Sequence, residues 1–267
     1  MPDFIAVAAT DLLLHERQSL ILNRLKSDGR VIAAAIAQEL SISEDTIRRD
    51  LREMASAGLC KRVYGGALPA TSDITSLTER LSLKPERKDA LARAAVPLFE
   101  PGMTIFIDAG STNLAIARAL SPTIRLTVIT NSPNVASALV DRQEIDVVVL
   151  GGKLDHRTGA VIGARAIADA AMLRPDICVL GSCGFDKETG ISASDFDEAE
   201  FKRSIAQRSR AVVAAITNEK LGVAAPFEVV AVGNRDHIVL EHDAEKGYVR
   251  ELEQGGVNVV LAGPLPS

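Results

Sequence analysis

The sequence contains little of several residue types, and each shortage argues against a class of protein. Aromatic residues make up only 3% of the 267 residues and tryptophan is absent, so surfaces that stack sugars or bases are poorly supplied. The three cysteines fit neither a disulfide framework nor a zinc-binding spacing. No apolar run reaches the roughly 20 residues of a membrane span. No lysine or arginine precedes Arg17, so we expect no secretory signal and a cytoplasmic protein.

The remaining composition is that of a globular protein. Hydrophobic residues account for 47% and charged residues for 24%, and the length allows one large or two modest domains. The net charge of −5 is unevenly distributed. Residues 15–62 carry nine basic and seven acidic side chains, so a slightly basic N-terminal part precedes an acidic remainder.

Two regions of the chain differ in their hydrophobic pattern. Residues 15–62 indicate successive helices without a strand-like run, whereas short runs rich in valine and isoleucine begin at Thr104. The predicted strands are 104–108, 125–130, 145–150, 176–181, 210–216, 228–233 and 257–262. Helical patterns precede or separate them, at 86–99, 112–120, 133–140, 165–173, 196–208 and 243–254. This alternation predicts an α/β domain with a mostly parallel sheet.

These patterns divide the chain into four segments. We predict an N-terminal arm over 1–14, a first, mainly helical domain over 15–68 and an α/β domain over 85–267. Residues 69–84 are rich in serine, threonine and proline, which indicates a linker.

The N-terminal part is typical of a helix-turn-helix domain. Helices are expected over 16–27, 33–40 and 44–57, and Ser43 is a good N-cap for the third. Ile47, Leu51 and Met54 form an apolar stripe on that helix. An arginine-bearing helix after a short turn is the arrangement that places base-reading side chains in the major groove.

A hairpin is expected after the third helix. Residues 59–64 favour a strand, and the two glycines at 65–66 favour a turn, which together form a wing. Lys61 and Arg62 would meet DNA phosphates there, and Glu44, Thr46, Arg48 and Arg49 would read bases. By itself the third helix could equally be a solvated amphipathic helix. Asp50 could pair with a neighbouring arginine instead of contacting DNA.

The same residues resemble the winged helix-turn-helix of the DeoR-type bacterial transcriptional regulators. The matching positions are Ser43, 46–51, 58–59, Lys61-Arg62 and 65–67. The resemblance covers roughly 17–67 and implies a motif that begins at Val31 and ends at Asp50. The predicted DNA-contacting residues are Ser43, Glu44, Thr46, Arg48, Arg49, Arg52, Lys61, Arg62 and Tyr64.

Polar and glycine-rich segments follow several predicted strands of the second domain. Asp108 is followed by Gly110, Ser111 and Thr112 at a helix start, where free N–H groups can bind an anion. A carboxylate repels phosphate, so we expect Asp108 to bond a ligand hydroxyl or to brace the loop. A plain capped turn is an alternative.

Further loops should reach the same sheet edge, where ligands of open α/β folds bind. They are 130–132, 151–153, 181–184 and 217–222. Lys220 either supplies a cation for phosphate or is a surface lysine. Glu198 and Lys202 are four residues apart on a helix, and this spacing alone favours a surface ion pair.

The second domain as a whole resembles the effector domain of the same DeoR family, which is similar to the ribose-5-phosphate isomerase fold. The resemblance implies a phosphorylated sugar or related metabolite as ligand. The predicted ligand-contacting residues are Asp108, Gly110, Ser111, Thr112, Asn131, Gly151, Gly152, Lys153, Gly184, Glu198, Lys202 and Lys220. One position departs from the family pattern, because Thr217 stands where an aspartate usually precedes the loop lysine.

We therefore predict a transcriptional regulator, a repressor of a sugar or polyol catabolic operon that a phosphorylated metabolite releases from its operator. DNA contacts from more than one small domain suggest a homo-oligomer. The histidines have no metal-binding spacing, and we expect no metal, no cofactor, no membrane association and no catalysis. Two alternatives remain: a sugar-phosphate isomerase, against which we see no carboxylate poised beside a lysine, and a protein-interaction module.

Overall fold

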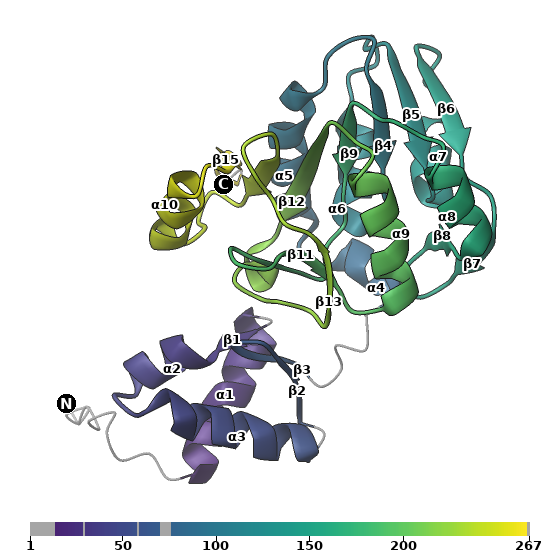
Figure 1. Cartoon of the computed structure of the whole chain (residues 1–267). Helices are drawn as coiled ribbons and strands as arrows, with labels where there is room; N and C mark the ends of the chain where they lie inside the picture. The colour runs from purple at the N-terminus through teal and green to yellow at the C-terminus, as the bar shows by residue number, and fades with distance from the viewer. Residues whose placement is uncertain (1–13, 29, 58, 70–75, 266–267) are drawn as a thin grey trace. The chain divides into compact units, whose positions relative to one another are not determined.

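The computed structural model describes residues 14–28, 30–57, 59–69 and 76–265. The chain divides into two compact units, Met1–Asp73 and Ile74–Ser267, whose elements are labelled in Figure 1. Most of the predicted N-terminal arm, and Gly58 of the DeoR-like motif, lie outside the described residues.

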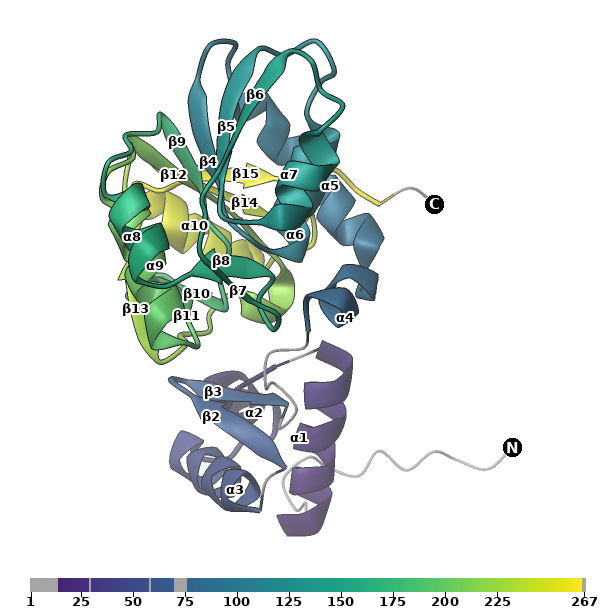
Figure 2. The ribbon, with the colours of Figure 1, turned by 90° about the vertical axis from the view of Figure 1, so that its right-hand side faces the viewer.

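The described residues of the first unit form helices and a small antiparallel sheet, as Figure 2 shows. Its elements are α1 (Leu14–Asp28), β1 (Val31–Ile32), α2 (Ala33–Glu39), α3 (Glu44–Ser56), β2 (Cys60–Val63) and β3 (Gly66–Pro69). The expectation of no strand before residue 59 was wrong. β1 pairs with β3, and a Cβ on Gly66 would lie 1.9 Å from the carbonyl oxygen of Val31. A strand of two residues leaves no periodic pattern in the sequence, so β1 is recognised only by its pairing with β3.

The predicted apolar stripe of α3 forms the centre of the first unit's core. Ile47, Leu51 and Met54 are buried with residues from α1 and α2. Ser43 is the N-cap of α3, and its side chain accepts a hydrogen bond from the Thr46 N–H. The helix therefore begins where the sequence predicts.

The described residues of the second unit form a seven-stranded sheet in the order β15-β14-β12-β9-β4-β5-β6, in which all neighbouring strands are parallel. The strands are β4 (Thr104–Ile107), β5 (Leu126–Thr130), β6 (Ile145–Val149), β9 (Ile177–Val179), β12 (Ala211–Ile216), β14 (His237–Leu240) and β15 (Asn258–Leu261). The predicted fold class, a winged helix-turn-helix followed by a mostly parallel α/β sheet, is confirmed.

For the parallel sheet, one strand assignment was wrong and one strand was missed, and four short strands of the second unit outside this sheet were also not predicted. The run 228–233 does not join the parallel sheet, because β13 (Phe227–Val230) pairs antiparallel with β11 (Gly190–Ala193). Its place is taken by β14, a four-residue segment between β12 and β15. A run this short resembles a loop until its neighbours are known. β11 also pairs with β10 (Gly184–Asp186), and β7 (Lys153–Asp155) forms a hairpin with β8 (Ala160–Ile162).

Helices cover both faces of the parallel sheet. Successive strand residues point to opposite faces: Ile105 and Ile107 pack with α5 (Pro85–Ala95), α6 (Ser111–Ala119) and α7 (Pro133–Leu139), whereas Phe106 packs with α8 (Ala164–Ala170), α9 (Phe196–Ala206) and α10 (Lys246–Gln254). The second unit also contains the short 3₁₀ helices η2 (Val96–Leu98) and η3 (Asn218–Lys220). No helix within the described ranges is long and apolar enough to cross a membrane.

The predicted linker 69–84 contains a helix. α4 (Leu77–Ser82) begins with a capping box, in which the Ser76 side chain accepts from the Glu79 N–H and the Glu79 carboxylate accepts from the Ser76 N–H. This helix belongs to the second unit. The composition of the segment concealed it, because serine and threonine also serve as helix caps.

Candidate DNA-binding surface and ligand site

The outer surface of α3 carries the arginines predicted to contact DNA. Arg48, Arg49 and Arg52 are exposed, whereas the stripe residues of the same helix are buried. Arg48 donates to Glu44 Oε1 at 2.7 Å, one turn earlier. Both side chains of this pair are largely exposed, so the pair contributes little to stability and can rearrange when a phosphate or base approaches.

Asp50 faces the interior of the first unit. Its side chain is 2% exposed and pairs with Arg17 of α1, whose Nη2 lies 3.0 Å from Asp50 Oδ1 and whose Nε also donates to Oδ2. The hydrogen bond from Arg17 to Asp50 raises the pKa of Arg17. Of the two roles left open for Asp50, the structure therefore shows the pairing with an arginine, although the partner is Arg17 and not a neighbour in α3.

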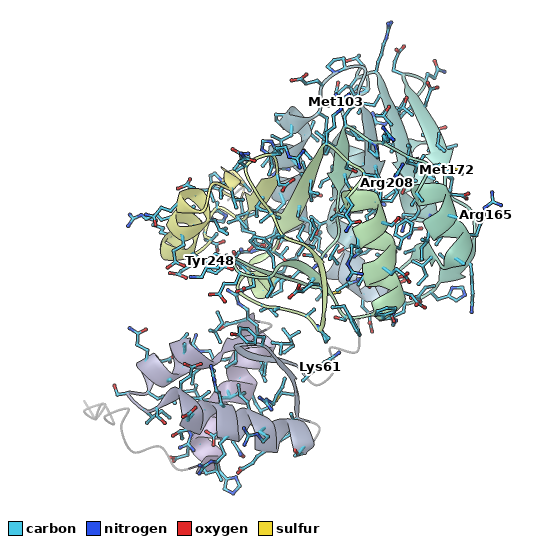
Figure 3. All side chains as sticks on the ribbon, viewed as in Figure 1. Lys61, Met103, Arg165, Met172, Arg208 and Tyr248 are labelled. Carbon is cyan, nitrogen blue, oxygen red and sulfur yellow. The ribbon has the colours of Figure 1, made fainter. Side chains whose placement is uncertain are left out.

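The predicted wing is present as β2 and β3. The strands pair in antiparallel register and turn at Gly65, whose φ of +78° suits a residue without Cβ. Arg62 is exposed and Tyr64 is 74% exposed, while Lys61, labelled in Figure 3, is half-buried on β2. Ser43 and Thr46 are engaged locally, with their hydroxyl oxygens 2.8 Å apart.

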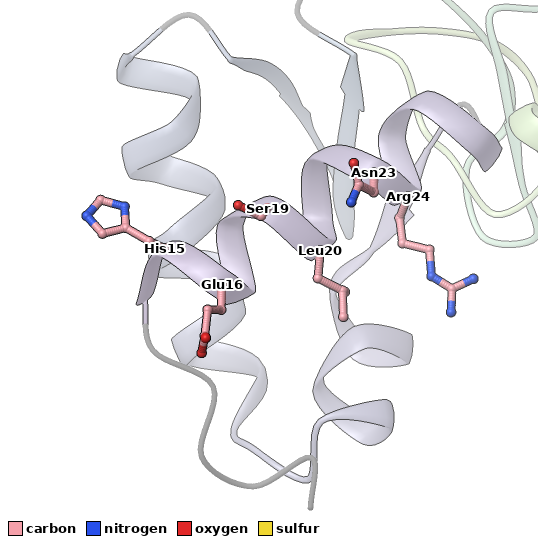
Figure 4. A pocket seen from close by; sticks show the side chains of 6 residues that line it. All are labelled: His15, Glu16, Ser19, Leu20, Asn23 and Arg24. Atoms are coloured by element: carbon pink, nitrogen blue, oxygen red, sulfur yellow. The ribbon is translucent and has the colours of Figure 1, made fainter. Parts of the chain in front are cut away.

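A second feature of this unit is an open hollow along α1, shown in Figure 4. Its lining residues are His15, Glu16, Ser19, Leu20, Asn23 and Arg24. None of the residues predicted to contact DNA or ligand lines it.

In the second unit, the loops that follow β4, β5 and β9 meet at the carboxyl edge of the sheet, as expected. The Ala109 N–H donates to Asn131 Oδ1 at 3.1 Å, and the Gly181 N–H donates to Asp108 Oδ2 at 3.0 Å. Gly181 allows this approach, because a Cβ there would lie 2.8 Å from the Ala109 carbonyl oxygen. Asp108 therefore braces the loops, one of its two expected roles.

A buried ion cluster joins α9 to these loops. Lys202 Nζ lies 2.6 Å from Glu198 Oε1 and 3.3 Å from Asp108 Oδ2, and it donates to the Gly181 carbonyl at 2.7 Å. Lys202 is 3% exposed. The surface ion pair that spacing favoured for Glu198 and Lys202 was therefore wrong, because spacing does not report which face of a helix is covered.

The two charges at the centre of this cluster stabilise each other. Burial opposes the charge on Lys202, but Asp108 and Glu198 outweigh it, and the pKa of Lys202 is raised. Burial likewise disfavours the charged form of Glu198, but Lys202 outweighs it, and the pKa of Glu198 is lowered. For Asp108 burial dominates, and its pKa is raised despite Lys202.

Two further cations, Arg80 and Lys88, belong to the same region and were not predicted. Lys88 is 7% exposed and its Nζ donates to the Arg80 carbonyl. Burial, reinforced by the charge of Lys220, lowers the pKa of Lys88 to about 8. The sequence carried a signal for Lys88. It precedes Leu91, Ala92 and Ala95 by helical spacing, so it lies on the same face of α5 as these buried residues. Arg80 had none, since α4 was read as linker.

Lys220 lies near these cations and is not a fully exposed surface lysine. Burial lowers its pKa, and the charges of Arg80 and Lys202 contribute in the same direction. The neighbouring Thr217 is buried, and its hydroxyl lies 2.6 Å from Glu219 Oε1. Thr217, at the position where the family usually has aspartate, thus donates a hydrogen bond to the carboxylate of Glu219.

The remaining predicted residues fall into two groups. Gly110 is the N-cap of α6, so the N–H groups of Ser111 and Thr112 stand at the helix start. Gly184, in contrast, lies within β10, where a Cβ would be 2.3 Å from the Val223 carbonyl oxygen. Packing therefore explains Gly184. The exposed residues Gly151, Gly152 and Lys153 make none of the contacts described above.

Several buried polar atoms of this region have no hydrogen-bond partner among the described residues. They are Arg80 Nε, Asn131 Nδ2, Ser182 Oγ and Glu198 Oε2. A buried polar group without a partner costs about 1–3 kcal/mol, and such groups are rare in folded proteins. Both donors and acceptors are represented, which fits a polar ligand with anionic and hydroxyl groups. We find no group of three or more His, Cys, Asp or Glu side chains suited to a metal within the described ranges.

An arginine-bearing helix-turn-helix unit and an α/β unit with a buried polar site define a DNA-binding protein with a sensor domain. The DeoR-like helix-turn-helix domain model matches residues 17–73 and the DeoR C-terminal sensor domain model matches residues 83–242. The chain belongs to the DeoR family of transcriptional regulators.

Curated relatives agree with this family. The chain is 30% identical over 252 residues to the HTH-type transcriptional regulator GolR of Listeria innocua. The matched region covers 92% of this chain and 98% of that protein. It is 34% identical over 208 residues to the glycerol-3-phosphate regulon repressor of Escherichia coli, covering 78% and 82% respectively. Among solved structures, it is similar to ribose 5-phosphate isomerase A of Neisseria gonorrhoeae with a TM-score of 0.39 and 17% identity, over 52% of this chain and 55% of that one.

Proposed function

We propose that this regulator is a repressor of an operon for sugar or polyol catabolism, and that a phosphorylated metabolite releases it from its operator. The observation that carries the proposal is the set of unpartnered polar atoms beside the cations at the carboxyl edge of the sheet. The name of the Escherichia coli relative supports a phosphorylated polyol as one candidate.

The charges of the site favour a dianionic ligand. Arg80, Lys88 and Lys220 repel one another in a desolvated region, and the pKa of each is lowered, first by burial. A phosphate placed among them would offset this repulsion. The start of α6, with the N–H groups of Ser111 and Thr112, supplies further donors.

The other predicted contacts divide by chemistry. Glu198 Oε2 is a free acceptor and Asn131 Nδ2 a free donor, so we assign both to ligand hydroxyl groups. Lys202 holds Glu198 in place and is a positioning residue. Gly151, Gly152 and Lys153 remain proposed ligand contacts on the exposed hairpin segment.

In the first unit, we propose that Arg48, Arg49 and Arg52 contact bases and phosphates from the outer surface of α3. Lys61, Arg62 and Tyr64 would contact the backbone from the wing, and Ser43, Glu44 and Thr46 the DNA at the start of the helix. We further propose that the protein acts in the cytoplasm as a homo-oligomer on paired half-sites, since one small unit buries too little DNA for tight specific binding.

The mechanism is thermodynamic linkage between two sites. A ligand induces transcription only if it binds the DNA-released state more tightly than the DNA-bound state. A typical coupling of about 1–3 kcal/mol changes operator affinity roughly 5- to 150-fold.

The test is operator binding with a panel of phosphate esters. Purified protein is titrated against the DNA upstream of its own gene by fluorescence anisotropy, with each ester and with the matched unphosphorylated alcohol as control. We expect one ester to weaken binding at least fivefold and its alcohol to have no effect. Specific binding that no ester changes would contradict the proposed ligand, and absence of specific binding at low salt would contradict the repressor.

A sugar-phosphate isomerase is the second candidate, and one observation favours it. The structure places the Glu198 carboxylate 2.6 Å from Lys202, so the expectation that no carboxylate stands beside a lysine was wrong. Proton transfer needs a base whose pKa lies near the working pH, and Lys202 instead lowers the pKa of Glu198. We therefore favour a regulator without catalysis. Conversion of ribose 5-phosphate by the protein, lost in Glu198→Gln, would reverse this preference.

A further inference from the structure

The helix α4 has an unusual position in the second unit. It is the first described element after residues 70–75, and it also contributes Arg80 to the ligand site. Six residues form too short a helix to be stable in isolation. Its location is therefore set by the contacts that its side chains make with the rest of the unit.

These contacts seat α4 on the turn between β7 and β8, which lies beside it in Figure 2. Arg80 Nη2 donates to the Thr158 carbonyl at 3.0 Å. Leu77 is buried against Gly159, where an added Cβ would lie 2.3 Å from Leu77 Cδ2. Lys88 Nζ holds the Arg80 carbonyl from α5.

The same turn is tied to the ligand site on its other side. The Val161 N–H donates to the Asn131 carbonyl at 2.7 Å. Arg157 lies 3.4 Å from Asp195, the N-cap of the helix that carries Glu198 and Lys202. α4 thus rests on a segment whose position depends on the residues around the ligand.

Arg80 is the side chain that connects the ligand site with α4 directly. The charges of Glu198 and Asp108 act on its guanidinium and favour its charged form, and its Nε is buried without a partner among the described residues. A hydrogen bond to an anion is stronger than one to a backbone carbonyl. An anionic ligand that takes up Nε would therefore draw the guanidinium toward itself and away from the Thr158 carbonyl, and would move the helix that carries it.

We infer that Arg80 binds the anionic group of the effector and converts its binding into a displacement of α4 from the Thr158–Gly159 turn. This inference rests on the proposed function. It assigns the coupling between effector and operator to the Arg80 side chain and to the turn on which α4 packs. Residues that bind the effector from elsewhere, such as Lys220 in η3, would set effector affinity without setting the coupling.

The experiment separates affinity from coupling. Effector affinity is measured by calorimetry without DNA, with glycerol 3-phosphate as first probe and then the ester that releases the wild type most strongly. Operator affinity is measured by anisotropy without ester and at an ester concentration that calorimetry shows to be saturating. The ratio of the two operator dissociation constants is the coupling factor. The variants are Arg80→Gln, Leu77→Ala and, as matched control, Lys220→Gln.

We expect the wild type to show a factor of at least about five. Lys220→Gln should bind the ester at least about tenfold more weakly and keep the wild-type factor at saturation. Arg80→Gln lacks the guanidinium that donates to the Thr158 carbonyl, and it should show a factor below about two at saturation. Leu77→Ala should keep ester affinity within about twofold of the wild type and lose at least two thirds of the coupling factor. This variant decides between the outcomes if Arg80→Gln cannot be saturated with ester.

A wild-type factor retained in both Arg80→Gln and Leu77→Ala would overturn the inference and leave the proposed function intact. A wild type that no ester releases would overturn the proposed function, and the inference with it. Ester binding in calorimetry reports that the second unit of each variant is folded, and operator binding without ester reports the same for the first unit.

Discussion

The two candidate binding sites of this protein hold their cations in opposite environments. In the first unit, Arg48, Arg49 and Arg52 are exposed on the outer surface of α3. In the second unit, Lys88 and Lys202 are buried and contact carbonyl or carboxylate oxygens. Exposed arginines suit a large polyanion that meets the surface, whereas buried cations suit a small anion that enters a prepared site.

This contrast has an energetic consequence. Exposed charges are well solvated and can be removed at little cost to folding, so their value lies in binding. Buried charges cost free energy unless they are paired, and removal of one partner leaves the other uncompensated. Substitutions in the two units should therefore separate binding from stability.

The largest expected effect is loss of stability in Lys202→Met. The substitution leaves the carboxylates of Asp108 and Glu198 buried without their cation, and we expect the free energy of unfolding to fall by about 3–5 kcal/mol. Urea denaturation followed by circular dichroism measures it. The control is Arg165→Ala, which breaks an exposed pair with Asp169 at the same spacing and should leave stability unchanged. Equal stability of the two variants would contradict the contrast.

The next effect is loss of operator affinity in the double variant Arg48→Ala, Arg49→Ala. Two arginine contacts at about 1–3 kcal/mol each predict a loss of at least roughly 30-fold, without a change in thermal stability. The salt dependence of binding should also decrease, by about one in slope for each phosphate contact removed. Arg118→Ala with Arg125→Ala removes the same charge from the second unit and should bind operator normally. An unchanged operator affinity in the α3 variant would exclude that surface.

Asp50→Ala tests the buried pair of Asp50 with Arg17. It removes a carboxylate that accepts two hydrogen bonds from Arg17 in a largely buried location, and we expect a loss of about 2 kcal/mol in the stability of the first unit. Thermal unfolding of the full chain measures it. Asp45→Asn, an exposed acidic residue at the start of the same helix, should cost less than about 1 kcal/mol. A loss of operator affinity without a loss of stability would instead assign Asp50 to DNA contact.

The smallest effect is a pH dependence of effector binding. The pKa of Lys88 is lowered to about 8 by burial and by Lys220, so its amine is charged at pH 7 and largely neutral at pH 9. Ester affinity should fall roughly tenfold over this range, because binding a phosphate dianion favours the charged amine. Calorimetry at the two pH values measures it, and Lys88→Met should show no such step. Identical pH dependence in the variant would place the titrating group elsewhere.

The sequence was more informative for the first unit than for the second. The stripe of Ile47, Leu51 and Met54 and the cap at Ser43 are local patterns, and local patterns determine most of a helix-turn-helix unit. Asp50 shows the limit, because its partner Arg17 lies 33 positions away and no spacing connects them.

In the second unit, the alternation of strands and helices predicted the sheet, and loops after strands predicted the site edge. Burial was not predictable from these patterns. Glu198 and Lys202 have the spacing of a surface pair but are covered by the loops after β4 and β9. Arg80 was missed because α4 reads as a linker, and β14 was missed because four residues show no period without their neighbours.

The central claim is that binding of one phosphate ester and binding of the operator weaken each other, although the two ligands bind to different units. Thermodynamic linkage makes this effect reciprocal. The most direct measurement is the dissociation constant of the active ester with and without saturating operator DNA, by calorimetry on the full chain. The account predicts that operator weakens ester binding by the same factor by which the ester weakens operator binding. Equal ester affinity with and without operator would contradict it.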